Sequence, residues 1–298
     1  MEKIILATLV LFLSTSTLFA QTEPVLNPDT GQPVVEEAPA SNWEHSLRAS
    51  LTGTQASFRN WNQGGVDNIA VLGATTFNSL YSKDKFSYKL DVNLRYGQTR
   101  IGDGDFIKSD DRIRIRNQIS RKFRDERLSA IFNLNFESQF DKGYDEPESD
   151  QKQLVSKFFS PAYISQVLGV GFKPDDYFRL EAGLAMKQTI VNDRSLSGFY
   201  NLDPGDTFRN EAGFSFLAGY ERQIMENIIY SGYVETFTNV NRSLSSTDVM
   251  FVNEISGQIN RYISANVELV LAYDDDITEK LQVKQIISVG FSYSFFGE

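Results

Sequence analysis

Three arginines at alternate positions are the residues of this sequence best placed to do chemistry. Arg112, Arg114 and Arg116 alternate with Ile113 and Ile115, so an extended strand would project all three guanidinium groups from one face. Such a row attracts anions and suits a pore constriction. Like charges this close also repel one another unless counter-charges or water screen them. An internal network of ion pairs that fills the interior is therefore the alternative interpretation.

Acidic residues gather at two further places, each expected to be a long connection. The first holds Asp103, Asp105, Asp110 and Asp111, and the second holds Asp274, Asp275 and Asp276. Carboxylate oxygens in flexible loops suit Ca²⁺, but this spacing matches no established Ca²⁺ loop. Solvated acidic loops are the favoured interpretation, and metal binding stays open.

Composition excludes several classes of function. The 298 residues include no Cys and one His, which excludes a thiolate metal site, a Cys nucleophile and a cluster of His ligands. The 39 acidic residues outnumber the 29 basic ones, so we expect no nucleic-acid partner, because phosphate contacts need clustered Lys and Arg. The sole His, His45, is expected at the start of the first strand, far from long connections that would receive substrate. We expect no enzyme and no cofactor, with an outer-membrane enzyme as a less favoured alternative.

A period of two dominates the chain from about residue 42 onward and predicts strands with two different faces. In the clearest case, from Phe86 to Gly97, every second residue is apolar and the others are polar. Related segments lie at 44–58, 67–81, 112–119, 129–137, 168–172, 178–186, 214–220, 227–240, 248–260, 263–273 and 283–295. In the segment 227–240 the pattern does not show which face is apolar. About twelve strands are predicted.

Short and long connections alternate between these strands. The short ones lie near 82–85, 124–127, 174–177, 223–227 and 260–262, and the longer ones near 59–66, 101–109, 141–157, 191–209, 241–247 and 274–281. This asymmetry predicts an all-β transmembrane antiparallel β-barrel with short periplasmic turns and long outer loops. A soluble periplasmic β-barrel is the competing fold. Aromatic residues beside the short turns, such as Tyr81 and Phe86, favour the membrane.

The N-terminal residues are predicted to lie outside the barrel domain, which we place at 42–298. Residues 1–20 have the features of a signal peptide, with Lys3 before an apolar run and Ala20 before the expected cleavage. Residues 21–41 hold half of the eight prolines and several acids, which predicts a disordered tether. Export by the Sec route and insertion into the outer membrane of a Gram-negative bacterium follow from this interpretation. Terminal Phe291, Tyr293 and Phe295 resemble the signal that outer-membrane assembly machinery reads.

An apolar face toward lipid leaves the opposite residues to line the lumen. If the turn at 124–127 ends a hairpin, Arg114 lies across from Glu137, and Arg116 lies across from Asn135. The predicted lining residues are Lys89, Asp91, Arg95, Arg112, Arg114, Arg116 and Glu137. The favoured function is a narrow channel for small polar solutes, and the alternative is a closed structural or surface-binding barrel. Expected partners are outer-membrane lipid, the assembly machinery during insertion and a small polar solute.

Several short motifs also resemble a known family. In order, they are Asn60-Trp61-x-x-Gly64-Gly65, Arg95-Tyr96-Gly97, Asp110-Asp111-Arg112, Ser160-Pro161-Ala162-Tyr163 and Tyr273-Asp274-Asp275-Asp276. Over residues 42–296 the chain resembles an uncharacterised family of secreted proteins from Bacteroidota that is catalogued as a domain of unknown function. The resemblance implies an outer-membrane β-barrel and implies no reaction or ligand.

Overall fold

A computed structural model describes residues 41–57, 66–145, 152–275 and 278–296. Residues 1–40, which hold the predicted signal peptide and nearly all of the predicted tether, lie outside the described residues. The same is true of Asn60, Trp61, Gly64 and Gly65 of the first motif, and of Asp276. The compact unit that contains the barrel runs from Asn42 to Glu298.

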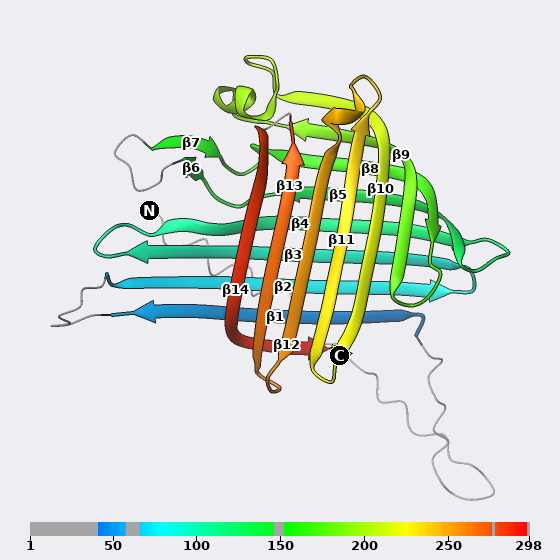
Figure 1. Ribbon diagram of the computed structural model, residues 1–298, viewed down its shortest axis with the longest axis horizontal. Helices are drawn as coiled ribbons and strands as arrows, with labels where there is room; N and C mark the ends of the chain where they lie inside the picture. Colours follow the sequence, from blue (N-terminus) through cyan, green and yellow to red (C-terminus); the bar gives the residue numbers. More distant parts are fainter. Residues whose placement is uncertain (1–40, 58–65, 146–151, 276–277, 297–298) are drawn as a thin grey trace, which may run out of the picture. The chain divides into compact units, whose positions relative to one another are not determined.

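Within the described residues, twelve antiparallel strands close into one barrel, which confirms the predicted fold class and strand number (Figure 1). The strands are β1 (Trp43–Ala56), β2 (Asn68–Lys83), β3 (Phe86–Ile101), β4 (Ile107–Lys122), β5 (Leu128–Ser138), β8 (Ala162–Phe172), β9 (Phe178–Ile190), β10 (Phe208–Met225), β11 (Ile228–Asn239), β12 (Asp248–Gln258), β13 (Ile263–Asp274) and β14 (Thr278–Phe296). Each strand pairs with the next in the barrel, and β14 pairs with β1 to close it. Strands β10 to β14 cross those of β1 to β4 in Figure 1, because strands tilt to close a barrel.

The connections differ between the two ends of the barrel. At one end they span residues 84–85, 123–127, 173–177, 226–227 and 259–262, close to the predicted turns. At the other end three connections are long, and the one from β5 to β8 carries a small hairpin, β6 (Gly143–Asp145) and β7 (Gln153–Ser156). Strands β3, β4, β13 and β14 extend further into this end than the sequence pattern predicts, because their polar residues resemble those of loops.

The outer surface of the barrel is apolar. Leu168, Leu184, Ile287 and Phe291 each expose more than 60% of their surface, at 64%, 63%, 69% and 68%. The opposite side of the same strands carries charged side chains in ion pairs, such as Lys187 of β9 and Lys284 of β14. A closed antiparallel barrel that is apolar outside and polar inside is the architecture of an outer-membrane β-barrel.

No helix among the described residues is long and apolar enough to cross a membrane.

Aromatic side chains gather on the outer face of β1 to β3, at the short-turn end. Trp43 contacts Tyr81 with a distance of 5.0 Å between ring centroids. His45 stacks between Trp43, at 5.6 Å, and Phe77, at 6.2 Å. Aromatic rings at this level suit the boundary between lipid and water. His45 thus belongs to an aromatic cluster on the outside of the barrel.

Two long connections fold together into a small cap at the other end. The connection from β9 to β10 contains a 3₁₀ helix, η1 (Arg194–Tyr200). Val191, Leu196 and Leu202 form a buried apolar cluster there, against which Leu154 of β7 packs. The Tyr200 hydroxyl donates a 2.8 Å hydrogen bond to the Val155 carbonyl oxygen. A compact apolar cluster therefore lies in the connections, outside the barrel wall.

Candidate functional site

The arginine row of β4 points into the barrel, where Arg114 forms a bidentate ion pair with Glu137. Arg114 lies opposite Glu137 and Arg116 opposite Asn135, so the predicted register is confirmed. Arg114 donates from Nε and Nη2 to the Glu137 carboxylate at 2.9 and 3.1 Å. This bidentate geometry is the strongest form of the arginine–carboxylate interaction. Glu137 therefore neutralises Arg114 from the neighbouring strand.

Arg114 and Arg116 also reach the far wall of the lumen. Arg114 Nη1 and Arg116 Nη2 donate to the Tyr233 hydroxyl of β11, at 3.3 and 3.4 Å. Arg116 Nη2 forms an ion pair of 3.4 Å with Glu235, also on β11. Because β4 and β11 are separated by four strands in the barrel order, these contacts bridge the lumen.

A second network connects β3 and β4 with β13 and β14. Arg95 forms ion pairs with Asp110 at 2.9 Å and with Glu268 at 2.8 Å. Arg112 lies 3.8 Å from Glu268, and Lys284 lies 2.7 Å from Asp110. The side chains of Arg95, Asp110 and Glu268 are 12%, 6% and 10% exposed. This side of the lumen is filled by buried, mutually compensating charges.

Asp110 and Asp111 were predicted to lie in a long loop, but the structure places them in a strand. Both belong to β4, where Asp110 faces the lumen network and Asp111 faces the other way. Asp111 accepts hydrogen bonds from the backbone amides of Phe140 and Asp141, at 2.8 and 2.9 Å. The prediction was wrong because a strand that faces water on its polar side has the same residue types as a solvated loop. Asp103 and Asp105 do lie, exposed, in the connection between β3 and β4.

A third group of charges lies near the long-loop end. Lys187 of β9 forms ion pairs with Asp248 of β12 at 2.6 Å and with Asp274 of β13 at 3.3 Å. Asp275 joins them, and oxygen atoms of the three carboxylates lie within 4.8 Å of one another. Asp275 also pairs with Arg242 at 3.3 Å. Of the described residues, these carboxylates are the ones placed to hold a cation, and Lys187 supplies that charge in the structure.

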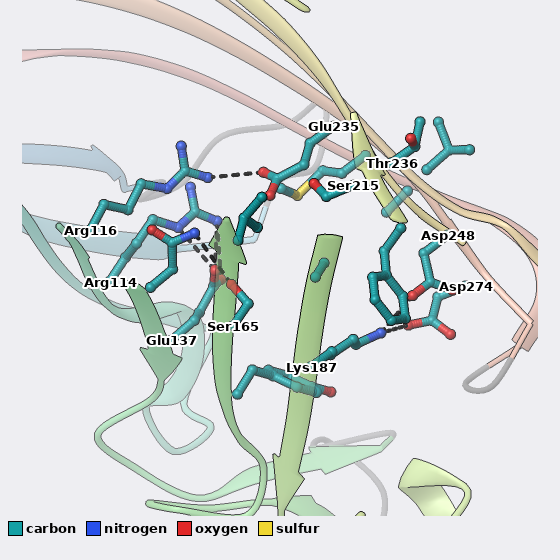
Figure 2. A pocket seen from close by; sticks show the side chains of 18 of the residues that line it. Arg114, Arg116, Glu137, Ser165, Lys187, Ser215, Glu235, Thr236, Asp248 and Asp274 are labelled. Atoms are coloured by element: carbon teal, nitrogen blue, oxygen red, sulfur yellow. Dashed lines mark hydrogen bonds and ion pairs between the residues drawn. The ribbon is translucent and has the colours of Figure 1, made fainter. Parts of the chain in front are cut away.

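Three cavities follow one another through the lumen. The first, of about 320 Å³, lies toward the long-loop end between the Arg114–Glu137 pair and the Lys187 group (Figure 2). The second, of about 230 Å³, shares Arg116 and Glu235 with the first. The third, of about 530 Å³, opens among the short turns and shares Lys89 and Glu181 with the second. Lys89 and Asp91, which were predicted to line the lumen, form an ion pair of 3.2 Å beside the second cavity.

Several lumen residues were missed by the sequence analysis, among them Tyr233, Glu235 and Lys187. The segment containing Tyr233 and Glu235 was predicted as a strand without an assigned face, because the aromatic residues Tyr233 and Phe237 point inward. Lys187 follows directly after a predicted strand, in register with its alternation. Extending the alternation of that strand by one polar position would have identified Lys187 as a lumen residue.

Part of the sequence is similar to an uncharacterised protein family. A family model described as "Protein of unknown function (DUF3078)" matches residues 54–144. No curated protein matches the sequence.

Distant similarities to solved structures are found as well. The translocator domain of the autotransporter NalP from Neisseria meningitidis shares 12% identity at a TM-score of 0.38, over 84% of this chain and 87% of that one. An outer membrane channel from Pseudomonas putida F1 shares 8% identity at a TM-score of 0.40, over 88% and 98%. The outer membrane channel DcaP of Acinetobacter baumannii shares 8% at 0.33, over 85% and 97%.

Proposed function

We propose that this outer-membrane barrel is a narrow passage for small polar solutes, restricted by ion pairs that span its lumen. The observation that carries the proposal is the series of three cavities, which share charged lining residues from the long-loop end to the short turns. Charged side chains that line and constrict a pore set which solutes enter it.

The Arg116–Glu235 pair is the lumen contact that a passing solute can separate most easily. Its distance is 3.4 Å, and each side chain keeps 26% of its surface exposed. Partly hydrated ion pairs contribute little free energy, about 0–1 kcal/mol at the surface. Arg114, in contrast, is held by two short bonds to Glu137. Arg116 and Glu235 therefore form the movable part of the constriction.

A closed structural barrel is the second candidate, and the network around Arg95 favours it. Arg95, Asp110, Glu268 and Lys284 join β3 and β4 to β13 and β14 through contacts of 2.7–2.9 Å. If the ion pairs elsewhere in the lumen are equally stable and do not separate, no solute can pass through the barrel. The two candidates differ in one observable, the flux of a small solute.

Liposome swelling separates the two candidates. The full-length protein, refolded and reconstituted in liposomes, is tested with arabinose and with the larger sugar raffinose. Because the second cavity measures about 230 Å³, arabinose is expected to enter and raffinose to be excluded. Empty liposomes are the control. Absence of arabinose flux would support the closed barrel and overturn the channel.

The proposal includes the route by which the protein reaches the membrane. Sec export, cleavage after Ala20 and insertion by the assembly machinery would leave a mature chain that starts at Gln21. N-terminal sequencing of the protein from an outer-membrane fraction tests this start directly.

A further inference from the structure

The first cavity has charged groups on two opposite sides. Figure 2 shows Arg114, Arg116 and Glu137 on one side, and Asp248 and Asp274 on the other. We name the first side the arginine pole, and Arg116 is the more exposed of its two arginines. The second side, with Lys187 between the two aspartates, is the aspartate pole. A ligand that lies between the poles meets the Arg116 guanidinium at one end and the Asp248 and Asp274 carboxylates at the other.

The arginine pole can accept a carboxylate at Arg116. Both contacts that Arg116 Nη2 makes, with Tyr233 and with Glu235, measure 3.4 Å. Typical N–H···O distances are about 2.7–3.2 Å, and a charge-assisted bond to a carboxylate is shorter and stronger than these two. A carboxylate from a ligand would therefore improve the bonding of Arg116, whereas Arg114 is already held by Glu137.

The aspartate pole can accept an ammonium group. One ammonium, that of Lys187, is shared by the carboxylates of Asp248 and Asp274, at 2.6 and 3.3 Å. Asp275 brings a third carboxylate within 4.8 Å of the other two, and it pairs with Arg242 at 3.3 Å. Carboxylates packed this closely repel one another, and an added positive charge relieves that repulsion.

Apolar side chains also line the first cavity. They are those of Val167, Ala185, Phe237, Met250 and Ala272. Its volume of about 320 Å³ is at the low end of the range of about 300–1,000 Å³ that is usual for ligand pockets. The cavity thus suits a small molecule that has an apolar part as well as charged groups.

We propose that the first cavity binds a small zwitterion, with its carboxylate at Arg116 and its ammonium group at Asp248 and Asp274. The chemical class is that of amino acids and short peptides with an apolar side chain or backbone segment. This inference rests on the proposed function, because it names the class of solute that the passage would select.

Isothermal titration of the refolded, full-length protein in detergent tests the two poles with simple probes. The probes are 4-aminobutanoate, 6-aminohexanoate and 8-aminooctanoate, which carry both charges at increasing separation. Hexanoate and hexylamine carry one charge each and are the matched controls. At least one of the three zwitterions is expected to bind ten times more tightly than both controls. Equal binding of all five, or binding of none, would overturn the inference.

Variants of each pole assign the contacts. Arg116→Gln and Asp248→Asn are each expected to weaken binding of the best zwitterion at least tenfold, and Asp274→Asn replaces Asp248→Asn if that variant does not fold. Asp91→Asn, in the second cavity, is the matched control and is expected to leave the affinity unchanged. Folded pole variants with unaltered affinity would overturn the inference.

The swelling assay with arabinose distinguishes failure of the zwitterion site from failure of the proposed passage. Arabinose flux without preference for zwitterions would overturn this inference and leave the proposed passage intact. Zwitterion binding without any flux would overturn the passage and leave a binding site in a closed barrel.

Discussion

At the scale of single residues, the lumen contains charges of two kinds. Arg95, Asp110 and Glu268 are nearly buried and joined by contacts of 2.8–2.9 Å, whereas Arg116 and Glu235 are partly exposed and 3.4 Å apart. Removing one partner of a buried pair leaves its counter-charge without compensation. We therefore expect the first group to be structural and the second to be available to solutes.

Replacement of Arg95 by Gln tests the structural role of the first group. It leaves Asp110 and Glu268 without the guanidinium between them, so we expect a loss of about 3 kcal/mol in the free energy of unfolding. Urea unfolding of the protein in lipid vesicles measures it. Lys122→Gln is the control, since Lys122 and Glu126 are exposed and 3.8 Å apart and should contribute less than about 1 kcal/mol. Equal losses in the two variants would contradict this account.

Asp193, in the connection before η1, gives a pH-dependent prediction. The hydrogen bond from Lys157, followed by those from Ser195, lowers the pKa of Asp193 from 3.8 to about 2. A lowered pKa means that these bonds stabilise the cap fully above about pH 4 and are lost as the pH falls through about 2. The NMR signal of the Ser195 amide, which donates to Asp193 at 3.0 Å, should titrate near pH 2. A midpoint near pH 4 would show that the contacts are absent.

At the scale of elements, the cap is a small folded unit on the barrel. Its cluster of Val191, Leu196 and Leu202 is buried, yet the sequence predicted only a long polar connection there. The leucines stand singly among Ser, Gly and Asp residues, without a period of two or 3.6. Burial in such a segment depends on the neighbouring connection and has no local signal.

Leu196→Ala is expected to loosen the cap and leave the barrel folded. Leu196 is 2% exposed, and truncation of a buried Leu costs about 2–5 kcal/mol. Limited proteolysis should then cut within 191–207, while the barrel still migrates as a folded band on an unheated gel. Leu244→Ala is the control, because Leu244 is 83% exposed. Resistance of both variants to cleavage would show that the cluster does not hold the cap.

The strands were the elements that could best be predicted from the sequence. Alternation finds all twelve because one face of each strand meets an apolar environment and the other meets water. The ends of β4 and β13 were missed, since polar residues such as Asp110 and Asp274 are in strands rather than loops. For β11 the face was ambiguous, because Tyr233 and Phe237 turn aromatic rings toward the lumen.

At the scale of the whole molecule, closure of the barrel decides which charges meet. The Arg114–Glu137 pair follows from one hairpin, so its register was predictable from the turn at 124–127. Arg95 and Glu268 lie 173 residues apart in sequence. Their contact depends on the number, tilt and stagger of all the strands. Alternation supplied the number but neither of the other two quantities, so the partners across the lumen could not be predicted.

The central claim is that ion pairs across the lumen control a narrow passage, and single-channel recording in planar bilayers tests it most directly. Wild-type protein is expected to give a small conductance. Glu235→Gln leaves the positive charge of Arg116 without its carboxylate and should shift selectivity toward anions, whereas Arg116→Gln should shift it toward cations. Both substitutions nearly preserve side-chain size, and opposite shifts are the predicted result. No conductance, or a selectivity that is the same in all three proteins, would contradict the claim.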